Sequence, residues 1–191
     1  MIAKLDFFEN YIKQASDKIN FSNEYLTLTD KVYKKFCKIK NSNNKIIFLG
    51  NGGSAAISSH VSVDLTKNGK IRSVCFNESD LITCFSNDYG QDKWMSKALD
   101  FYAIKKDIVV IISSSGESKN VISAADYCNK NKYDCITFTG NKINNSLIKK
   151  NKNGLNLWVN SESYNLIELC HLFTLLMIID RIIGKSVYKN L

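Results

Sequence analysis

The chain has 191 residues, of which 45% are apolar and 11% aromatic, which is enough for a globular core and excludes disorder of the whole chain. The formal charge is +8, but the lysines are spread along the chain and form no block. Such a distribution is typical of solvated helix faces and disfavours a nucleic-acid partner. We therefore expect one globular domain over residues 1–191.

No segment indicates secretion or a membrane. The amino-terminal residues alternate charged and apolar side chains and contain no unbroken apolar run. The longest apolar stretch, residues 172–179, is far shorter than the ~20 residues of a membrane span. The six cysteines form no C-x-x-C pair and mostly lie in apolar runs, which indicates reduced thiols. We expect a cytoplasmic protein without a membrane partner.

Two helices are predicted at the start of the chain. Apolar residues recur at helical spacing from Phe8 to Ile19 and again from Tyr25 to Ile39. Ser22 lies between the two sets and is suited to cap the second helix. This helical pair occupies residues 1–41.

From residue 45 the pattern changes to short β-rich runs that alternate with helical stretches, which is typical of parallel βαβ units. Strands are expected at residues 45–49, 71–76, 108–112, 135–139 and 155–159. Helices are expected at residues 54–67, 80–86, 91–99 and 119–130, with a weaker helical turn at 144–149 and a long closing helix at 163–183. The closing helix is apolar on almost all sides, so we expect a second subunit to cover part of it. The fold class is α/β, with a three-layer, doubly wound, five-stranded parallel sheet over residues 45–191.

A serine-rich turn follows the third predicted strand. It reads Ser113-Ser-Ser-Gly-Glu-Ser118 and precedes a helix that begins at Lys119. Serine hydroxyls together with the free N–H groups and the dipole of a helix amino end favour an anion, so this turn predicts a phosphate site. The alternative is a plain connection in which Ser118 only caps the helix.

A glycine-rich turn, Gly50-Asn-Gly-Gly-Ser54, also follows a strand and opens a helix. It lacks the lysine of a P-loop and the spacing of a dinucleotide motif, so no nucleotide cofactor is expected. The carboxyl ends of parallel strands meet at one edge of a sheet. We therefore expect the two turns to converge on one crevice.

The two histidines each lie near a carboxylate. His60 is followed by Asp64 four residues later, and Glu168 is followed by His171 three residues later, so each pair shares a helix face. Such a set suits either a divalent metal such as zinc or the acid and base of a proton transfer. Alternatively, both pairs are structural.

A further turn, Asn87-Asp-Tyr-Gly90, follows an apolar helical stretch. It presents Asn87 and Asp88 either to sugar hydroxyls or simply to solvent.

Taken in order, these motifs resemble the sugar isomerase (SIS) family, in particular the phosphoheptose isomerases. The resemblance is carried by Phe48-Leu-Gly-Asn-Gly-Gly-Ser54 with His60 and Asp64, by Ser86-Asn-Asp-Tyr-Gly90, and by Ile112-Ser-Ser-Ser-Gly-Glu-Ser-Lys-Asn-Val121. It implies a flavodoxin-like strand order and an aldose-ketose isomerase that converts sedoheptulose 7-phosphate to D-glycero-D-manno-heptose 7-phosphate for lipopolysaccharide heptose. It also implies a homotetramer with sites at subunit interfaces, and often a zinc ion.

The resemblance assigns roles to particular residues. Substrate contacts fall on Asn51, Gly52, Gly53, Ser54, Asn87, Asp88, Ser113, Ser114, Ser115, Ser118 and Glu168. Catalysis falls on Asp64, Glu168 and His171, and the metal on His60, Asp64 and Glu168.

The chain departs from the family pattern at two places. Asp64 stands where the family carries a Glu, one methylene longer. In the closing helix the family has a Gln, a His three residues later and a second His eight residues after the Gln; here these are Glu168, His171 and Leu176. Because Leu176 replaces a catalytic and metal-binding His, an alternative function is open. In it the protein is a catalytically impaired relative that senses a sugar phosphate or serves as a scaffold, as in relatives that associate with a replication initiator.

Overall fold

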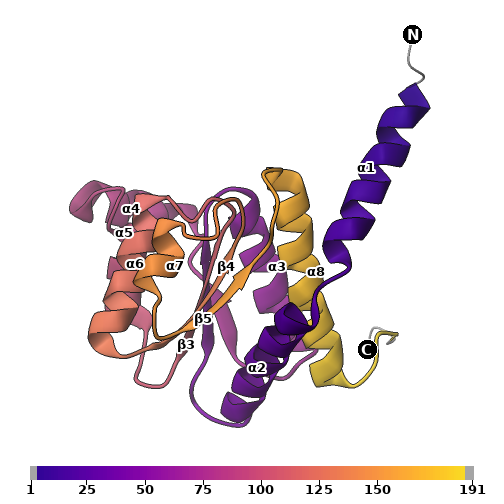
Figure 1. Cartoon of the computed structure of the whole chain (residues 1–191). Helices are drawn as coiled ribbons and strands as arrows, with labels where there is room; N and C mark the ends of the chain where they lie inside the picture. Colours follow the sequence, from indigo (N-terminus) through magenta and orange to yellow (C-terminus); the bar gives the residue numbers. More distant parts are fainter. Residues whose placement is uncertain (1–3, 188–191) are drawn as a thin grey trace.

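The computed structural model describes residues 4–187 and is built around a five-stranded sheet in the order β2-β1-β3-β4-β5 (Figure 1). All of its strand pairs are parallel. The strands are β1 Ile46–Gly50, β2 Ser73–Cys75, β3 Ile108–Ser113, β4 Asp134–Thr139 and β5 Leu155–Trp158. The predicted fold class and flavodoxin-like order are confirmed.

Helices cover both faces of the sheet (Figure 1). Successive side chains of a strand point to opposite faces, so in β1 the residues Ile46 and Phe48 join one apolar core while Ile47 and Leu49 join the other. The first core lies under α2, α3 and α8, and the second under α5, α6 and α7. The helices are α1 Lys4–Ile19, α2 Asn23–Ile39, α3 Gly53–Lys67, α4 Ser79–Tyr89, α5 Trp94–Tyr102, α6 Lys119–Asn131, α7 Ser146–Lys150 and α8 Tyr164–Ile183.

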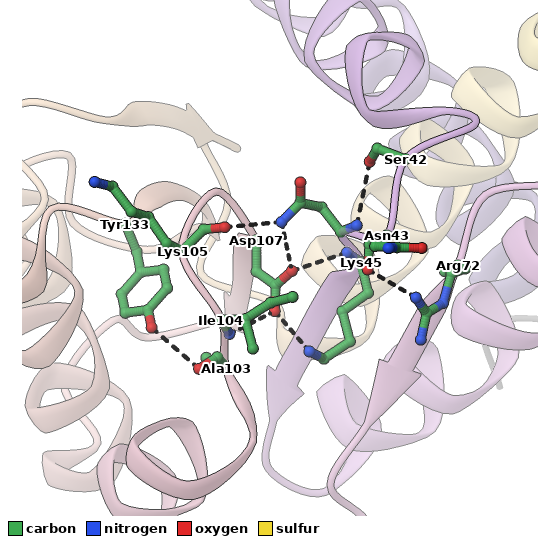
Figure 2. Close-up of polar contacts among 10 residues, drawn as sticks. Ser42, Asn43, Lys45, Arg72, Ala103, Ile104, Lys105, Asp107 and Tyr133 are labelled. Atoms are coloured by element: carbon green, nitrogen blue, oxygen red, sulfur yellow. Dashed lines mark hydrogen bonds and ion pairs between the residues drawn. The ribbon is translucent and has the colours of Figure 1, made fainter.

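A buried carboxylate joins the amino ends of β1 and β3 (Figure 2). Asp107 is fully buried and accepts hydrogen bonds from the backbone N–H of Lys45 at 2.9 Å and from that of Ile104 at 3.0 Å. The Nζ of Lys45 lies 2.6 Å from the same carboxylate. A charge inside a protein is tolerated only when it is paired and hydrogen-bonded in this way. Asp107 therefore holds β1 and β3 together at the end of the sheet where these strands begin.

Helices α1 and α8 expose apolar side chains. α1 extends away from the rest of the chain and contacts α8 near its own end (Figure 1). On α1, four large apolar residues are 60–69% exposed: Leu5, Phe7, Phe8 and Ile12. On α8, Leu169 and Phe173 are also exposed. Between residues 4 and 187 no helix combines the length and apolar character that crossing a membrane requires.

Some element boundaries differ from the predictions. The helix expected at 80–86 continues through Asn87 and Asp88 to Tyr89, because the helix ends only at Gly90, whose φ is +89°. Asn87 and Asp88 thus lie in the last turn of a helix, and the expected loop there is wrong. Strand β2 is three residues long instead of the expected 71–76. Ser22 caps α2 as predicted, since its hydroxyl accepts from the N–H of Tyr25.

Candidate active site

A cavity of about 240 Å³ lies at the carboxyl ends of β1 and β3. In the strand order 2-1-3-4-5 this is the switch point, where doubly wound sheets bind their ligands. The two turns predicted to converge do so here. The lining residues are Asn51, Gly52, Gly53, Ser54, Ile112, Ser113, Ser114, Ser115, Ser118, Tyr164 and Glu168.

The glycine turn needs glycine for two different reasons. Gly52, at the N-cap of α3, has φ +53° and ψ −122°, a backbone conformation that side chains exclude. At Gly50 the backbone leaves no space for a side chain, and at Gly53 a side chain would have to displace the end of Glu168. A Cβ at Gly50 would lie 2.6 Å from the backbone of Ser54, and one at Gly53 would lie 2.2 Å from Oε2 of Glu168. The amino end of α3 is therefore open to the cavity on one side and packed against α8 on the other.

Some hydroxyls of the serine turn accept backbone N–H groups of the turn itself, and others have no hydrogen-bond partner in it. The Oγ of Ser113 accepts the N–H of Gly116 at 3.2 Å, and the Oγ of Ser115 accepts that of Glu117 at 3.3 Å. The buried Oγ of Ser114 has no partner among residues 4–187. Ser118 holds the N-cap position of α6, yet its side chain makes no capping bond. Accepting an N–H does not use the hydroxyl proton, so all four serines, Ser113 and Ser115 included, keep a proton to donate to a ligand.

The outer side of the serine turn is held by the start of α7. Glu117 accepts the N–H of Ser146 at 3.1 Å and its hydroxyl at 2.6 Å, and these bonds hold the pKa of the Glu117 carboxyl below its usual value. The carbonyl of Gly116 accepts the N–H of Leu147 at 2.9 Å. The charge of Glu117 is thus directed away from the cavity, and the cavity wall made by this turn is neutral.

Among residues 4–187, Glu168 is the one charged residue that lines the cavity. Its carboxylate comes from the second turn of α8 and lies against Gly53, the first residue of α3. The first N–H groups of a helix have no partner within the helix, and its dipole is positive at this end, so a carboxylate is favoured there. The site therefore places a carboxylate and a neutral serine turn on the same cavity.

His60 and Asp64 pair on α3 outside the cavity lining. The Nε2 of His60 lies 3.3 Å from the Asp64 carboxylate, which also accepts the amide of Asn68 at 3.2 Å. The shared helix face expected from their spacing is present. However, Glu168 does not join them, and the described residues contain no group of three His, Cys, Asp or Glu that could hold a metal ion. The residues expected to bind zinc do not form a complete site within one chain.

His171 lies in the core instead of the cavity. It is fully buried, its Nε2–H donates to the carbonyl of Thr139 at 3.1 Å, and its ring packs edge-on against Phe138. Burial lowers the pKa of His171 to about 4. Leu176, one and a half turns later, packs against the same apolar core. His171 does not contact the cavity that Glu168 lines.

Asn87 and Asp88 lie away from the cavity on α4, where the amide of Asn87 donates to the carboxylate of Asp88 at 3.0 Å. Two lining residues, Ile112 and Tyr164, are not among the site residues predicted from the sequence; Tyr164 is the polar one of the two. It is 56% exposed at the first position of α8. The available signal was its position after β5, because the loops at the carboxyl ends of all strands lie on the same edge.

The strand order and the cavity at the switch point are those of a flavodoxin-like α/β domain, the class to which SIS domains belong. The profile of the SIS domain family matches residues 10–140, and the chain belongs to this family. Within the family its relatives are phosphoheptose isomerases. That of Thermodesulfovibrio yellowstonii is 31% identical over 138 residues, 69% of this chain and 69% of the relative. That of Aneurinibacillus thermoaerophilus is 27% identical over 144 residues, 71% of this chain and 73% of the relative.

The fold agrees with this relationship. The structure of a phosphoheptose isomerase from Francisella tularensis matches with a TM-score of 0.87 at 23% identity, over 96% of this chain and 100% of that one. The resemblance to phosphoheptose isomerases drawn from the motifs is confirmed.

Proposed function

We propose that this protein is a phosphosugar isomerase that interconverts sedoheptulose 7-phosphate and D-glycero-D-manno-heptose 7-phosphate. The observation that carries the proposal is the carboxylate of Glu168 on the same cavity as the neutral serine turn. A sugar phosphate needs both features, an anion cradle for one end and a base for the other. The relationship to phosphoheptose isomerases supports the choice of a heptose.

The serine turn binds the phosphate in this proposal. Ser114 and Ser118 donate their hydroxyls, and the amino end of α6 adds its N–H groups and dipole. Because these donors are neutral, the phosphate is held by hydrogen bonds instead of by a lysine. Ser113 and Ser115 also shape the turn, since their Oγ atoms accept backbone N–H groups, and their hydroxyl protons remain available to the phosphate.

Glu168 then moves the proton between the two carbons. The carboxylate takes a proton from C1 of the ketose, the C2 carbonyl oxygen gains a proton, and an enediol forms. Return of the carbon-bound proton to C2 with loss of the O1 proton leaves the aldehyde at C1, so no atoms or electrons are lost. The free N–H groups at the start of α3 polarise the carbonyl oxygen. In this proposal Glu168 supplies the base in a chain that carries Leu176 where the family has a catalytic His.

Asp64, His171 and a metal have no step in this mechanism. His171 is buried against Thr139, and Asp64 is paired with His60 outside the cavity lining. Two donors on α3 do not complete a zinc site in one chain. The residues that line the cavity carry every step of the proposed reaction.

We also propose that the chain assembles as a homotetramer with its sites at subunit interfaces. The apolar residues of α1, 60–69% exposed, need a cover that one chain does not supply. Asn87 and Asp88 lie outside the cavity of their own chain and would serve the site of a neighbouring copy. Light scattering on the purified protein measures the assembly, and a monomer would contradict this part.

A second function is favoured by one specific observation, the apolar packing of Leu176 where the family has a catalytic His. In this reading the cavity binds a sugar phosphate without turning it over, as a sensor or a protein scaffold would.

Hydrogen exchange separates the two functions. The purified protein is incubated in heavy water with sedoheptulose 7-phosphate, and with hexose and pentose phosphates, while NMR follows the C1 and C2 hydrogens and metal content is measured on the same sample. Exchange with the heptose supports the isomerase. Binding without exchange supports the second function, and absence of both contradicts each.

A further inference from the structure

The two turns of the cavity are joined by a reciprocal pair of side-chain amides. The Nδ2 of Asn51 donates to Oδ1 of Asn120 at 3.0 Å, and the Nδ2 of Asn120 donates to Oδ1 of Asn51 at 2.9 Å. Asn51 belongs to the glycine turn after β1, and Asn120 to the first turn of α6 after the serine turn. The pair therefore spans the switch point between β1 and β3.

Asn120 is the fixed member of the pair. It is only 6% exposed, and its Oδ1 also accepts the N–H of Val121 at 3.0 Å. Both donors to this oxygen are N–H groups, so the orientation of the Asn120 amide is set: turning it over would break both bonds. Asn51, in contrast, is exposed and depends on Asn120 for its position.

We propose that Asn120 is a positioning residue for the sugar-phosphate cavity, which holds the glycine turn at a fixed distance from the serine turn through Asn51. This inference rests on the proposed function. It also changes the role of Asn51, whose amide oxygen and nitrogen are both engaged by Asn120. Asn51 then serves the ligand through the placement of Gly52 and Gly53 instead of through its own side chain.

The chemistry of the pair provides a sharp test, because each member must donate and accept. In Asn120→Asp the ionised carboxylate has no proton to donate to Oδ1 of Asn51, so two oxygens face each other. A protonated carboxyl group has the same donor and acceptor arrangement as an amide and restores both bonds. Affinity for the ligand should therefore return in this variant as the pH falls, and should not return in Asn120→Leu.

The experiment compares Asn120→Asp and Asn120→Leu with the wild type. Asn131→Asp is the matched control, because Asn131 is an exposed residue at the other end of α6 whose amide donates to Tyr127. Calorimetric titration with sedoheptulose 7-phosphate is run at about pH 7.5 and at about pH 4, where an ordinary Asp is about half protonated, and each variant is expressed relative to the wild type at the same pH.

At the higher pH we expect Asn120→Asp to bind sedoheptulose 7-phosphate about tenfold more weakly than the wild type does. Its KM should rise by a larger factor than its kcat falls. At the lower pH the ratio to wild type should move toward one. Asn120→Leu should bind weakly at both pH values, and Asn131→Asp should bind as tightly as the wild type. Wild-type affinity in Asn120→Asp or Asn120→Leu at both pH values would overturn the proposal. So would a loss of thermal stability without a change in affinity.

A ligand-free measurement keeps this test independent of the proposed function. The side-chain amide signals of Asn51 are followed by NMR in the protein alone. They should shift in Asn120→Asp, recover at the lower pH, and stay unchanged in Asn131→Asp. If the wild type binds no sugar phosphate, the proposed function fails while these signals still decide whether Asn120 holds Asn51. Unchanged Asn51 signals would overturn the positioning role.

Discussion

The carboxylate of Glu168 lies directly against the Cα of Gly53: a Cβ at Gly53 would be 2.2 Å from Oε2 of Glu168. This contact joins the first residue of α3 to α8. The space that a side chain at Gly53 would take is occupied by the end of the Glu168 side chain, which would have to move to admit one. The same contact holds the carboxylate at the cavity.

A methyl group at Gly53 should destabilise the protein by displacing Glu168. We expect Gly53→Ala to lower the free energy of unfolding by about 0.5–1.5 kcal/mol, the cost of forcing a flexible side chain into a poorer rotamer. In a Glu168→Ala background the same change should cost much less. Urea denaturation of the four proteins of this cycle measures the coupling. Equal costs in both backgrounds would show that the clash is not with Glu168.

Removing the charge of Glu168 should stop the chemistry and spare binding. Glutamine has the same shape but cannot accept a proton from carbon, so Glu168→Gln should lower the hydrogen-exchange rate by roughly 10²- to 10⁴-fold. Affinity for sedoheptulose 7-phosphate should change only a few-fold. Glu162→Gln, at an exposed residue just before α8, serves as the control. Exchange at the wild-type rate in Glu168→Gln would reject Glu168 as the base.

Two adjacent serines should respond in opposite ways to alanine. Ser114 has a buried hydroxyl without a partner, so Ser114→Ala should leave stability unchanged or raised and weaken sugar-phosphate binding by about 2- to 10-fold. Ser113 accepts the N–H of Gly116, so Ser113→Ala should lower stability by about 1 kcal/mol. Thermal melts and calorimetric titration of both variants check this. A stability loss in Ser114→Ala would show that its hydroxyl serves the turn.

His171 should make the protein less stable in mild acid. Burial lowers its pKa to about 4 from an ordinary 6.5, so between these values the unfolded chain binds more protons than the folded one. The free energy of unfolding therefore falls as the pH drops from 6.5 to 4, by on the order of 3 kcal/mol over the whole window.

Urea denaturation across this pH window measures the slope. His171→Gln should flatten it, because glutamine does not titrate. His60→Gln, at the exposed histidine, should retain it. A slope that persists unchanged in His171→Gln would assign it to other groups.

The buried ion pair of Asp107 and Lys45 lies where strands β1 and β3 begin. It should contribute far more to the free energy of unfolding than an exposed ion pair. In Asp107→Asn the mostly buried ammonium of Lys45 loses its charged partner. We expect the free energy of unfolding to fall by roughly 3–5 kcal/mol. Asp134→Asn removes an exposed pair with Lys35 and should cost less than about 1 kcal/mol. Urea denaturation compares them, and similar losses in both would mean that burial of Asp107 does not govern the effect.

Much of the fold follows from the sequence because its signals are local. Apolar runs such as Ile108–Ile112 define strands by themselves, and a turn of serine or glycine after each one marks the carboxyl edge of a parallel sheet. The boundaries predicted for the helices are less accurate where a helix continues through polar residues. α4 includes Asn87 and Asp88 because nothing in their side chains ends a helix, whereas Gly90 does.

The sequence by itself determined the α/β class and the two turns that follow β1 and β3, since each depends on neighbouring residues. Only the tertiary structure decided which titratable groups reach the cavity. Glu168 and His171 are three residues apart on one helix, yet Glu168 lies against Gly53 and His171 is buried against Thr139. Likewise, Asn51 and Asn120 are 69 residues apart and meet only because β1 and β3 are neighbours in the sheet. Such contacts depend on how helices pack over the sheet, which no local pattern encodes.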